Sequence, residues 1–84
     1  MITRETKVGI GSGLEARPIA VLVQIATRFK CSIRIEYNGR SIDPRSLMGA
    51  MNLAAPYGSA MTVICDGAGE EEAADAICDY ISGR

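Results

Sequence analysis

The sequence predicts an α+β fold in which an antiparallel sheet carries helices on one face and meets water on the other. Apolar and polar residues alternate over 32–37 and 60–66, with the period of half-buried strands. Asn38-Gly39, directly after the first of these segments, is typical of a two-residue hairpin because both residues tolerate positive φ. Two longer segments, 16–29 and 70–81, repeat their apolar residues at helical spacing. Strands grouped in this way, with few long crossovers, favour antiparallel pairing.

The composition predicts one globular domain over residues 1–84. Hydrophobic residues make up 48% of the chain and charged residues 23%, a balance typical of folded proteins. The formal net charge of −1 excludes general attraction to nucleic acid, which needs a basic excess. The longest apolar run, IAVLVQIA, is too short to span a bilayer. With no recognisable signal peptide, we expect a cytoplasmic protein that binds neither nucleic acid nor membranes directly.

The residues best suited to catalysis are scarce. Cys31, Cys65 and Cys78 are odd in number and form no C-x-x-C pair, which argues against a disulfide framework and a zinc site. The chain contains no histidine, so the commonest general base, metal ligand and phosphoryl acceptor is missing. We therefore expect reduced thiols, no metal site, no cofactor and no enzymatic activity.

The first third of the chain predicts a strand, a loop and a helix. Residues 4–8 alternate so that Thr6 and Val8 share a face of a half-buried strand. The GIGSG segment predicts a flexible loop and matches neither a dinucleotide-binding fingerprint nor a Walker loop. A helix follows, with Pro18 tolerated in its first turn. Its apolar residues run from the start to about Phe29: Ala16, Ile19, Ala20, Val23, Ala26 and Phe29.

A hairpin is predicted in the middle of the chain. The strand at 32–37 directs one set of residues to the core: Ile33, Ile35 and Tyr37. A short strand at 40–43 returns and stops at Pro44. Ser46 then stands at the N-cap position of a short apolar helix, LMGAMNL at 47–53.

A turn, a strand and a helix complete the prediction. The turn PYGS at 56–59 leads into the strand at 60–66, whose inward residues are Met61, Val63 and Cys65. Three glutamates at 70–72 open the last helix, where negative charge suits the helix N-terminus. Gly83 ends this helix, and its core face carries Ala73, Ile77, Tyr80 and Ile81.

Four motifs together resemble the histidine-containing phosphocarrier (HPr) family of the bacterial sugar phosphotransferase system. They are GL-x-ARP at 13–18, NG at 38–39, SLMGAMNLA at 46–54 and G-x-x-x-x-V-x-x-x-G at 58–67. The resemblance implies an open-faced β-sandwich of order βαββαβα. In that fold a four-stranded antiparallel sheet of order 1-4-2-3 is covered on one face by three helices.

The chain departs from the family pattern at its centre. Glu15 stands where the carriers have the histidine that receives phosphate from enzyme I. A carboxylate cannot form a phosphoramidate, so the chain is more similar to the regulatory branch that lacks this histidine, Crh (catabolite repression HPr). Glu15 either compensates the helix dipole, worth about 0.3–1 kcal/mol, or imitates in part the phosphorylated carrier beside Arg17. An acyl phosphate on Glu15 is a third reading, although no partner carboxylates for a metal are evident nearby.

Ser46 matches the family's regulatory phosphorylation site. Its hydroxyl can cap the following helix, worth about 1 kcal/mol, and the resemblance implies that HPr kinase/phosphorylase modifies it with ATP. Leu47, Met48 and Met51 are either core residues or an exposed patch for partners, since methionine-rich patches adapt to several surfaces. The implied reader is the catabolite control protein, a DNA-binding regulator of the lactose-repressor type. Arg17 and position 15 would share that interface.

The leading hypothesis is thus a phosphoprotein in carbon catabolite repression that regulates transcription as a corepressor. A phosphocarrier that uses Glu15 unconventionally is the first alternative. A family member diverted to another partner, with Ser46 only a helix cap, is the second. Exchange of the first strand between two subunits would give a homodimer, a further possibility that the glycine-rich loop leaves open.

Overall fold

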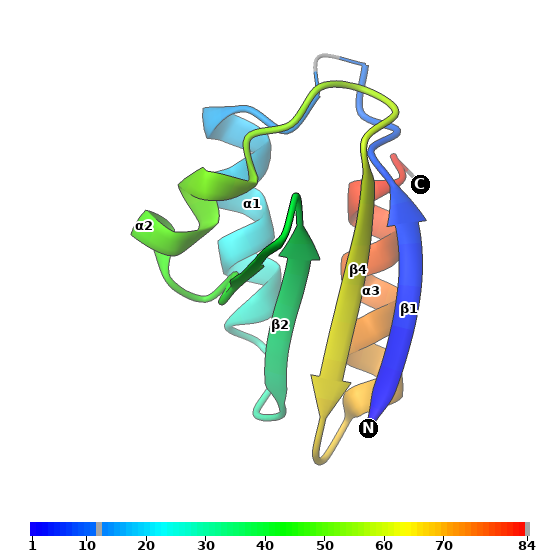
Figure 1. The fold of residues 1–84 in the computed structure, drawn as a ribbon. Helices are drawn as coiled ribbons and strands as arrows, with labels where there is room; N and C mark the ends of the chain where they lie inside the picture. Colours follow the sequence, from blue (N-terminus) through cyan, green and yellow to red (C-terminus); the bar gives the residue numbers. More distant parts are fainter. Residues whose placement is uncertain (12, 84) are drawn as a thin grey trace.

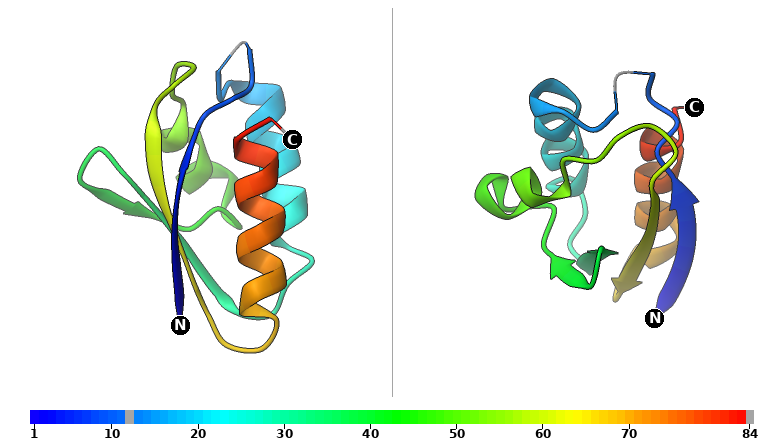
Figure 2. Two further views of the ribbon diagram at one scale, coloured as in Figure 1. Left: turned by 90° about the vertical axis from the view of Figure 1, so that its right-hand side faces the viewer. Right: turned by 45° about the horizontal axis from the view of Figure 1, so that its top comes forward.

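A four-stranded antiparallel sheet forms one layer of the molecule, and three helices cover one of its faces (Figure 1). The computed structural model describes residues 1–11 and 13–83 and has the strand order β1-β4-β2-β3. Figure 2 shows the helices on the same side of the sheet. The predicted fold class, sheet order and helix placement are confirmed.

The element bounds agree closely with the sequence pattern in the two inner strands and differ at the edges. In chain order the elements are β1 (Ile2–Lys7), α1 (Ala16–Ala26), β2 (Ser32–Tyr37), β3 (Arg40–Ile42), α2 (Leu47–Ala50), the 3₁₀ helix η1 (Met51–Leu53), β4 (Ala60–Asp66) and α3 (Glu70–Ile81). Strand β1 begins two residues earlier than predicted, because its pairing with β4 starts at Ile2 opposite Cys65. Strand β3 ends one residue earlier than predicted.

Strand β4 lies in the middle of the sheet and pairs with β1 on one side and β2 on the other. Thr6 lies opposite Met61, and Ile35 lies opposite Val63. The alternation predicted for β4 is confirmed, because its inward residues are fully buried: Met61, Val63 and Cys65. The hairpin between β2 and β3 is confirmed too, with positive φ at Asn38 (56°) and Gly39 (79°).

Helix α1 is shorter than predicted, and its buried face differs from the predicted one. Its buried residues are Ile19, Leu22 and Ala26, whereas Ala16 and Ala20 are exposed. The predicted face was therefore wrong at the two alanines, and it omitted Leu22. The helix ends at Ala26 because the next residues tighten into i→i+3 hydrogen bonds, such as the 3.3 Å bond from the N–H of Phe29 to the carbonyl of Ala26.

The core fills the space between the sheet and the helices with aliphatic side chains. The largest fully buried ones include Leu14, Leu22, Ile35, Leu53 and Ile77, and each such side chain contributes about 1.5–3 kcal/mol when removed from water. No polar or charged residue of the described ranges is buried among them. Within these same ranges, no helix combines the length and apolar character needed to cross a bilayer.

The end of β1 is held against the end of α3. The N–H of Gly9 donates to the carbonyl of Ile81 at 2.9 Å. A side chain at position 9 would meet backbone, because an added Cβ would lie 2.0 Å from the carbonyl oxygen of Ser82. Of the predicted 9–13 loop, Ser12 lies outside the described residues.

Candidate functional site

Ser46 caps helix α2 as the sequence predicted. Its backbone is extended (φ −90°, ψ 118°), and its Oγ accepts a hydrogen bond from the N–H of Gly49 at 3.2 Å. Its carbonyl accepts the first helical bond, from the N–H of Ala50 at 2.7 Å. The residue is exposed, so the hydroxyl that stabilises the helix is also open to solvent.

The apolar residues after Ser46 divide between surface and core. Leu47 is 54% exposed, Met48 84% and Met51 58%, while Leu53 is fully buried. The single α-helical turn of α2 tightens into η1 at Met51, and this short, irregular segment buries Ala50 and Leu53 alone of its apolar side chains. The three exposed side chains, called the α2 patch below, are therefore surface residues rather than core.

Glu15 and Arg17 lie at the start of α1. Glu15 is the N-cap residue (φ −115°, ψ −170°), and its carbonyl accepts from the N–H of Ile19 at 2.8 Å. Its carboxylate makes no capping hydrogen bond, so the first-turn N–H groups lack the side-chain partner that a cap supplies. Both side chains are exposed, and neither makes an ion pair within residues 1–11 and 13–83.

The start of α1 and the α2 segment are tied together through the backbone. Leu14 and Ala55 form an antiparallel bridge, with N–H to carbonyl distances of 2.8 and 3.2 Å. Gly13 makes this approach possible, because its φ is 80° and an added Cβ would lie 2.6 Å from the carbonyl oxygen of Ala55. Helices α1 and α2 lie side by side in Figures 1 and 2. The two predicted groups of site residues thus sit on adjoining elements.

Two residues that the sequence interpretation did not assign to the site also belong to this region. The hydroxyl of Tyr80 in α3 donates to the carbonyl of Pro18 at 2.9 Å and so ties the first turn of α1 to α3. Burial raises the pKa of Tyr80, which keeps the hydroxyl protonated as a donor. Val21 is 41% exposed and lies one turn after Arg17. Both residues could have been noticed in the sequence. A half-buried tyrosine usually needs a hydrogen-bond partner, and Val21 lies outside the helical spacing of the predicted core residues.

The three thiols are not part of this site. Cys31 and Cys65 are buried and Cys78 is half-buried, and all three are free in the part of the chain that the structure describes. Burial, followed by the nearby Cys31 and Cys78 thiols, raises the pKa of Cys65 to about 11. A thiol of such high pKa is neutral and a poor nucleophile at pH 7.

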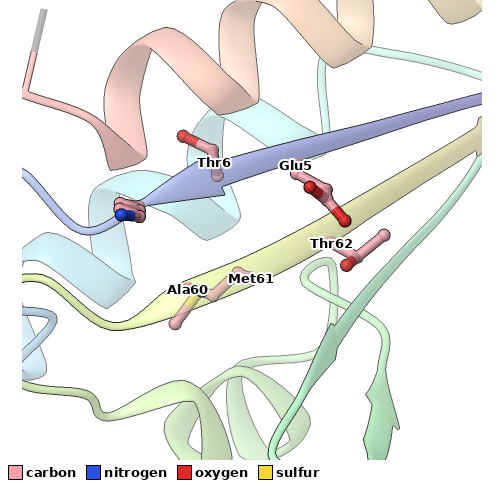
Figure 3. A pocket seen from close by; sticks show the side chains of 6 residues that line it. Glu5, Thr6, Ala60, Met61 and Thr62 are labelled. Atoms are coloured by element: carbon pink, nitrogen blue, oxygen red, sulfur yellow. The ribbon is translucent and has the colours of Figure 1, made fainter.

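A shallow hollow lies elsewhere, between β1 and β4 (Figure 3). Glu5 and Thr62, which are opposite each other in the register, lie along it. Its lining shares no residue with the groups at α1 and α2: Glu5, Thr6, Lys7, Ala60, Met61 and Thr62.

The fold is a small open-faced β-sandwich with an exposed N-cap serine, and comparison with known families identifies the family to which it belongs. The family model described as "PTS HPr component phosphorylation site" matches residues 2–83. The chain belongs to the HPr family.

The relatives of this chain include proteins named Crh and proteins named HPr. The HPr-like protein Crh of Halalkalibacterium halodurans is 41% identical over 81 residues, which is 96% of each chain. The phosphocarrier protein HPr of Cupriavidus necator is 42% identical over 84 residues, covering 100% of this chain and 94% of the relative. Overall identity to these two relatives is therefore nearly the same.

Solved structures agree with this assignment. The phosphocarrier protein HPr from Bacillus anthracis has a TM-score of 0.90 at 39% identity and covers 95% of each chain. Crh of Bacillus subtilis has a TM-score of 0.78 at 34% identity, covering 100% of this chain and 97% of the other. That Crh crystal structure is described as a dimer with a swapped domain.

Proposed function

We propose that this protein is a non-catalytic regulatory member of the HPr family, switched by phosphorylation of Ser46. The observation that carries the proposal is the exposed Ser46 hydroxyl beside the exposed α2 patch, in a chain that has no histidine. Glu15 occupies the position of the family's acceptor, and its side chain cannot hold phosphate as an imidazole does. The regulatory phosphate would then be attached at the start of α2 rather than at the start of α1.

The modifying enzyme of this proposal is HPr kinase/phosphorylase. The γ-phosphoryl group of ATP forms an ester with Ser46 Oγ, the hydroxyl proton passes to a base of the kinase, and ADP leaves. The product gains about two negative charges. These charges stand at the rim of the α2 patch, whose three side chains stay apolar. The two states therefore differ in the charge at the rim of this patch.

The reader in this proposal is the catabolite control protein, a lactose-repressor-type regulator, and the modified protein is its corepressor in the cytoplasm. A partner with apolar pockets for Leu47, Met48 and Met51 and a basic group for the phosphate would bind the modified state selectively. Arg17 and Glu15 would lie at the edge of the same interface, since α1 and α2 adjoin. DNA is then contacted by the regulator and not by this chain.

Incubation with the kinase and ATP tests the proposal directly. The wild type should gain one phosphate, and Ser46→Ala should gain none. Ser46→Asn is the matched control, because asparagine keeps an N-cap acceptor but offers no hydroxyl. A wild-type protein that stays unmodified while a known HPr substrate is labelled would overturn the proposal.

A phosphocarrier role is the second candidate, and the 42% identity to an HPr phosphocarrier favours it. Glu15 would then carry an acyl phosphate, next to the open N–H groups of α1. Enzyme I with labelled phosphoenolpyruvate separates the two roles. Label on the wild type that Glu15→Gln abolishes would support the carrier role; absence of label with an active HPr control would exclude it.

A homodimer is the assembly that the Crh relatives suggest, and in this chain β1 is the element best placed to exchange. It is an edge strand that pairs only with β4 within the described residues. The glycine-rich 9–13 segment follows it directly. Sedimentation or light scattering at increasing protein concentration tests this assembly.

A further inference from the structure

Arg45 directly precedes Ser46, and its side chain hydrogen-bonds to backbone carbonyls at the end of α1. Its Nε donates to the carbonyl of Ala26 at 3.4 Å, and an Nη donates to the carbonyl of Phe29 at 2.6 Å. The same Nη also donates to the carbonyl of Cys31. One half-buried guanidinium therefore serves three backbone acceptors between α1 and β2.

Of these three carbonyls only that of Ala26 belongs to α1, where it also accepts from the N–H of Phe29 at 3.3 Å; the other two follow the end of the helix. The last carbonyls of a helix have no intrahelical partner, and a cation there is favourable. Helix α1 has no basic residue in its last turn. Arg45 supplies the missing cation from a segment 19 positions after Ala26, and its planar fork of donors suits several acceptors at once.

The backbone around Ser46 is fixed from the same turn. The N–H of Arg45 donates to Asp43 Oδ1 at 2.9 Å, and the N–H of Ser46 donates to the Asp43 carbonyl at 3.2 Å. Pro44 between them is fully buried. The Arg45 side chain thus holds the turn at 43–46 against the end of α1. The Ser46 hydroxyl takes no part in these contacts.

We infer that Arg45 is a positioning residue for the modification of Ser46, and that its guanidinium does not pair with the phosphate. The inference rests on the proposed function, because it takes Ser46 as the modified residue. An arginine beside a phosphoserine would ordinarily be its first counter-ion. Here the guanidinium would have to release three backbone carbonyls to reach the phosphate. The phosphate charge is then neutralised by a basic group of the partner and not by Arg45. Binding of the partner therefore depends more strongly on phosphorylation than it would if Arg45 neutralised the phosphate.

The first test follows Arg45 itself and needs no kinase. Phosphoserine is placed at position 46 during synthesis, and the Nε–H signal of Arg45 is compared by ¹⁵N NMR in the modified and unmodified proteins. We expect the same chemical shift and a slow exchange rate within about twofold, because the carbonyl bonds persist. Arg28 is the control, since its exposed side chain makes no hydrogen bond to the described residues and should exchange fast in both forms. A clearly different Nε–H shift in the modified protein, with either slow or faster exchange, would show that Arg45 leaves the carbonyls and would overturn the inference.

The second test measures positioning through the kinase. Without the hydrogen bonds of the Arg45 side chain, the turn before Ser46 adopts the geometry that the kinase binds only part of the time. Arg45→Gln should therefore raise KM about tenfold and leave kcat within about twofold. Arg45→Lys should recover part of the loss, and Arg28→Gln should match the wild type. An unchanged KM for folded Arg45→Gln would overturn the positioning role; should that variant not fold, Arg45→Lys decides by the same measure. A wild-type protein that accepts no phosphate from the kinase would refute the proposed function. The NMR comparison would then still show whether the Arg45 guanidinium stays on the carbonyls or pairs with a phosphate at position 46.

Discussion

The Glu15 carboxylate occupies the N-cap of α1 without acting as a cap. It is a fixed single charge near the positive end of an 11-residue helix, where a phosphorylated histidine would bring about two charges and more acceptor oxygens. Arg17, two residues further along the chain, is exposed and makes no ion pair with Glu15 in the described structure. Both groups remain available to a partner.

Replacement of this one residue should restore the carrier chemistry. Glu15→His puts an imidazole nitrogen at the family's acceptor position, on a helix start whose backbone is already in place. We expect the variant to take acid-labile label from phosphoenolpyruvate and enzyme I, while the wild type takes none. Glu15→Gln controls for loss of charge alone and should also stay unlabelled. A folded Glu15→His without label would mean that the surface around α2 no longer docks enzyme I.

At the scale of elements, the inner strands and helix α3 were predictable, and the end of α1 was not. Strands β2 and β4 were predicted residue for residue, because each has one face in the core and alternates strictly. The end of α1 was predicted near Phe29, but the helix stops at Ala26, where 3₁₀-type bonds and the distant Arg45 take over. Sequence periodicity describes which side is apolar; it carries no information on a cap supplied by a remote residue.

The N-cap at Ser46 should contribute measurably to stability. Ser46→Ala removes the acceptor for the Gly49 N–H, and we expect a loss of about 1 kcal/mol in the free energy of unfolding. Ser46→Asn retains an acceptor, so its loss should be no more than a few tenths of a kcal/mol. Urea unfolding followed by circular dichroism measures both. Equal losses in the two variants would show that the hydroxyl does not act as a cap.

The first turn of α3 should make the stability depend on pH. The amino group of Met1, then the N–H of Gly67, lowers the pKa of Glu70, and Glu70 in turn raises the pKa of the amino group. The depressed carboxyl pKa gives stability that is lost as pH falls through it, and the raised amino pKa gives stability that is lost as pH rises through it. The shared contribution should therefore be greatest between about pH 5 and pH 8.

Glu70→Gln tests this dependence, because glutamine keeps the shape and loses the charge. The melting temperature of the variant should fall less steeply than that of the wild type as pH drops below about 5. Glu71→Gln is the control, since Glu71 is the next residue, is exposed and has no partner among the described residues. Parallel curves for the wild type and Glu70→Gln would contradict the prediction.

At the scale of the whole molecule, the candidate site was visible in the sequence, but its supports were not. Ser46, Glu15 and the α2 patch stand in contiguous motifs, so a resemblance could point to them. Arg45 acts on residues 14 to 19 positions away, and Tyr80 acts on Pro18 across 62 positions. Such supports depend on how the helices pack against one another, which no local pattern records.

The contact between Gly9 and the end of α3 should hold β1 in its own subunit. Gly9→Ala places a Cβ against the carbonyl of Ser82, and we expect about 1–3 kcal/mol of destabilisation. It should also increase the dimer fraction, because β1 loses an intramolecular anchor. Gly11→Ala is the matched control, since an added Cβ there meets nothing within 4 Å. Urea unfolding and light scattering measure both effects, and equal behaviour of the two variants would contradict the proposed anchor.

The exposure of Leu47, Met48 and Met51 has an evolutionary consequence. Their side chains add little to the core, so their replacement is nearly neutral for folding, and under the proposed function selection would act on them through binding. A lineage could therefore change its partners one side chain at a time, without first acquiring compensating mutations. After gene duplication, two proteins of this fold could come to bind different partners while both remain folded.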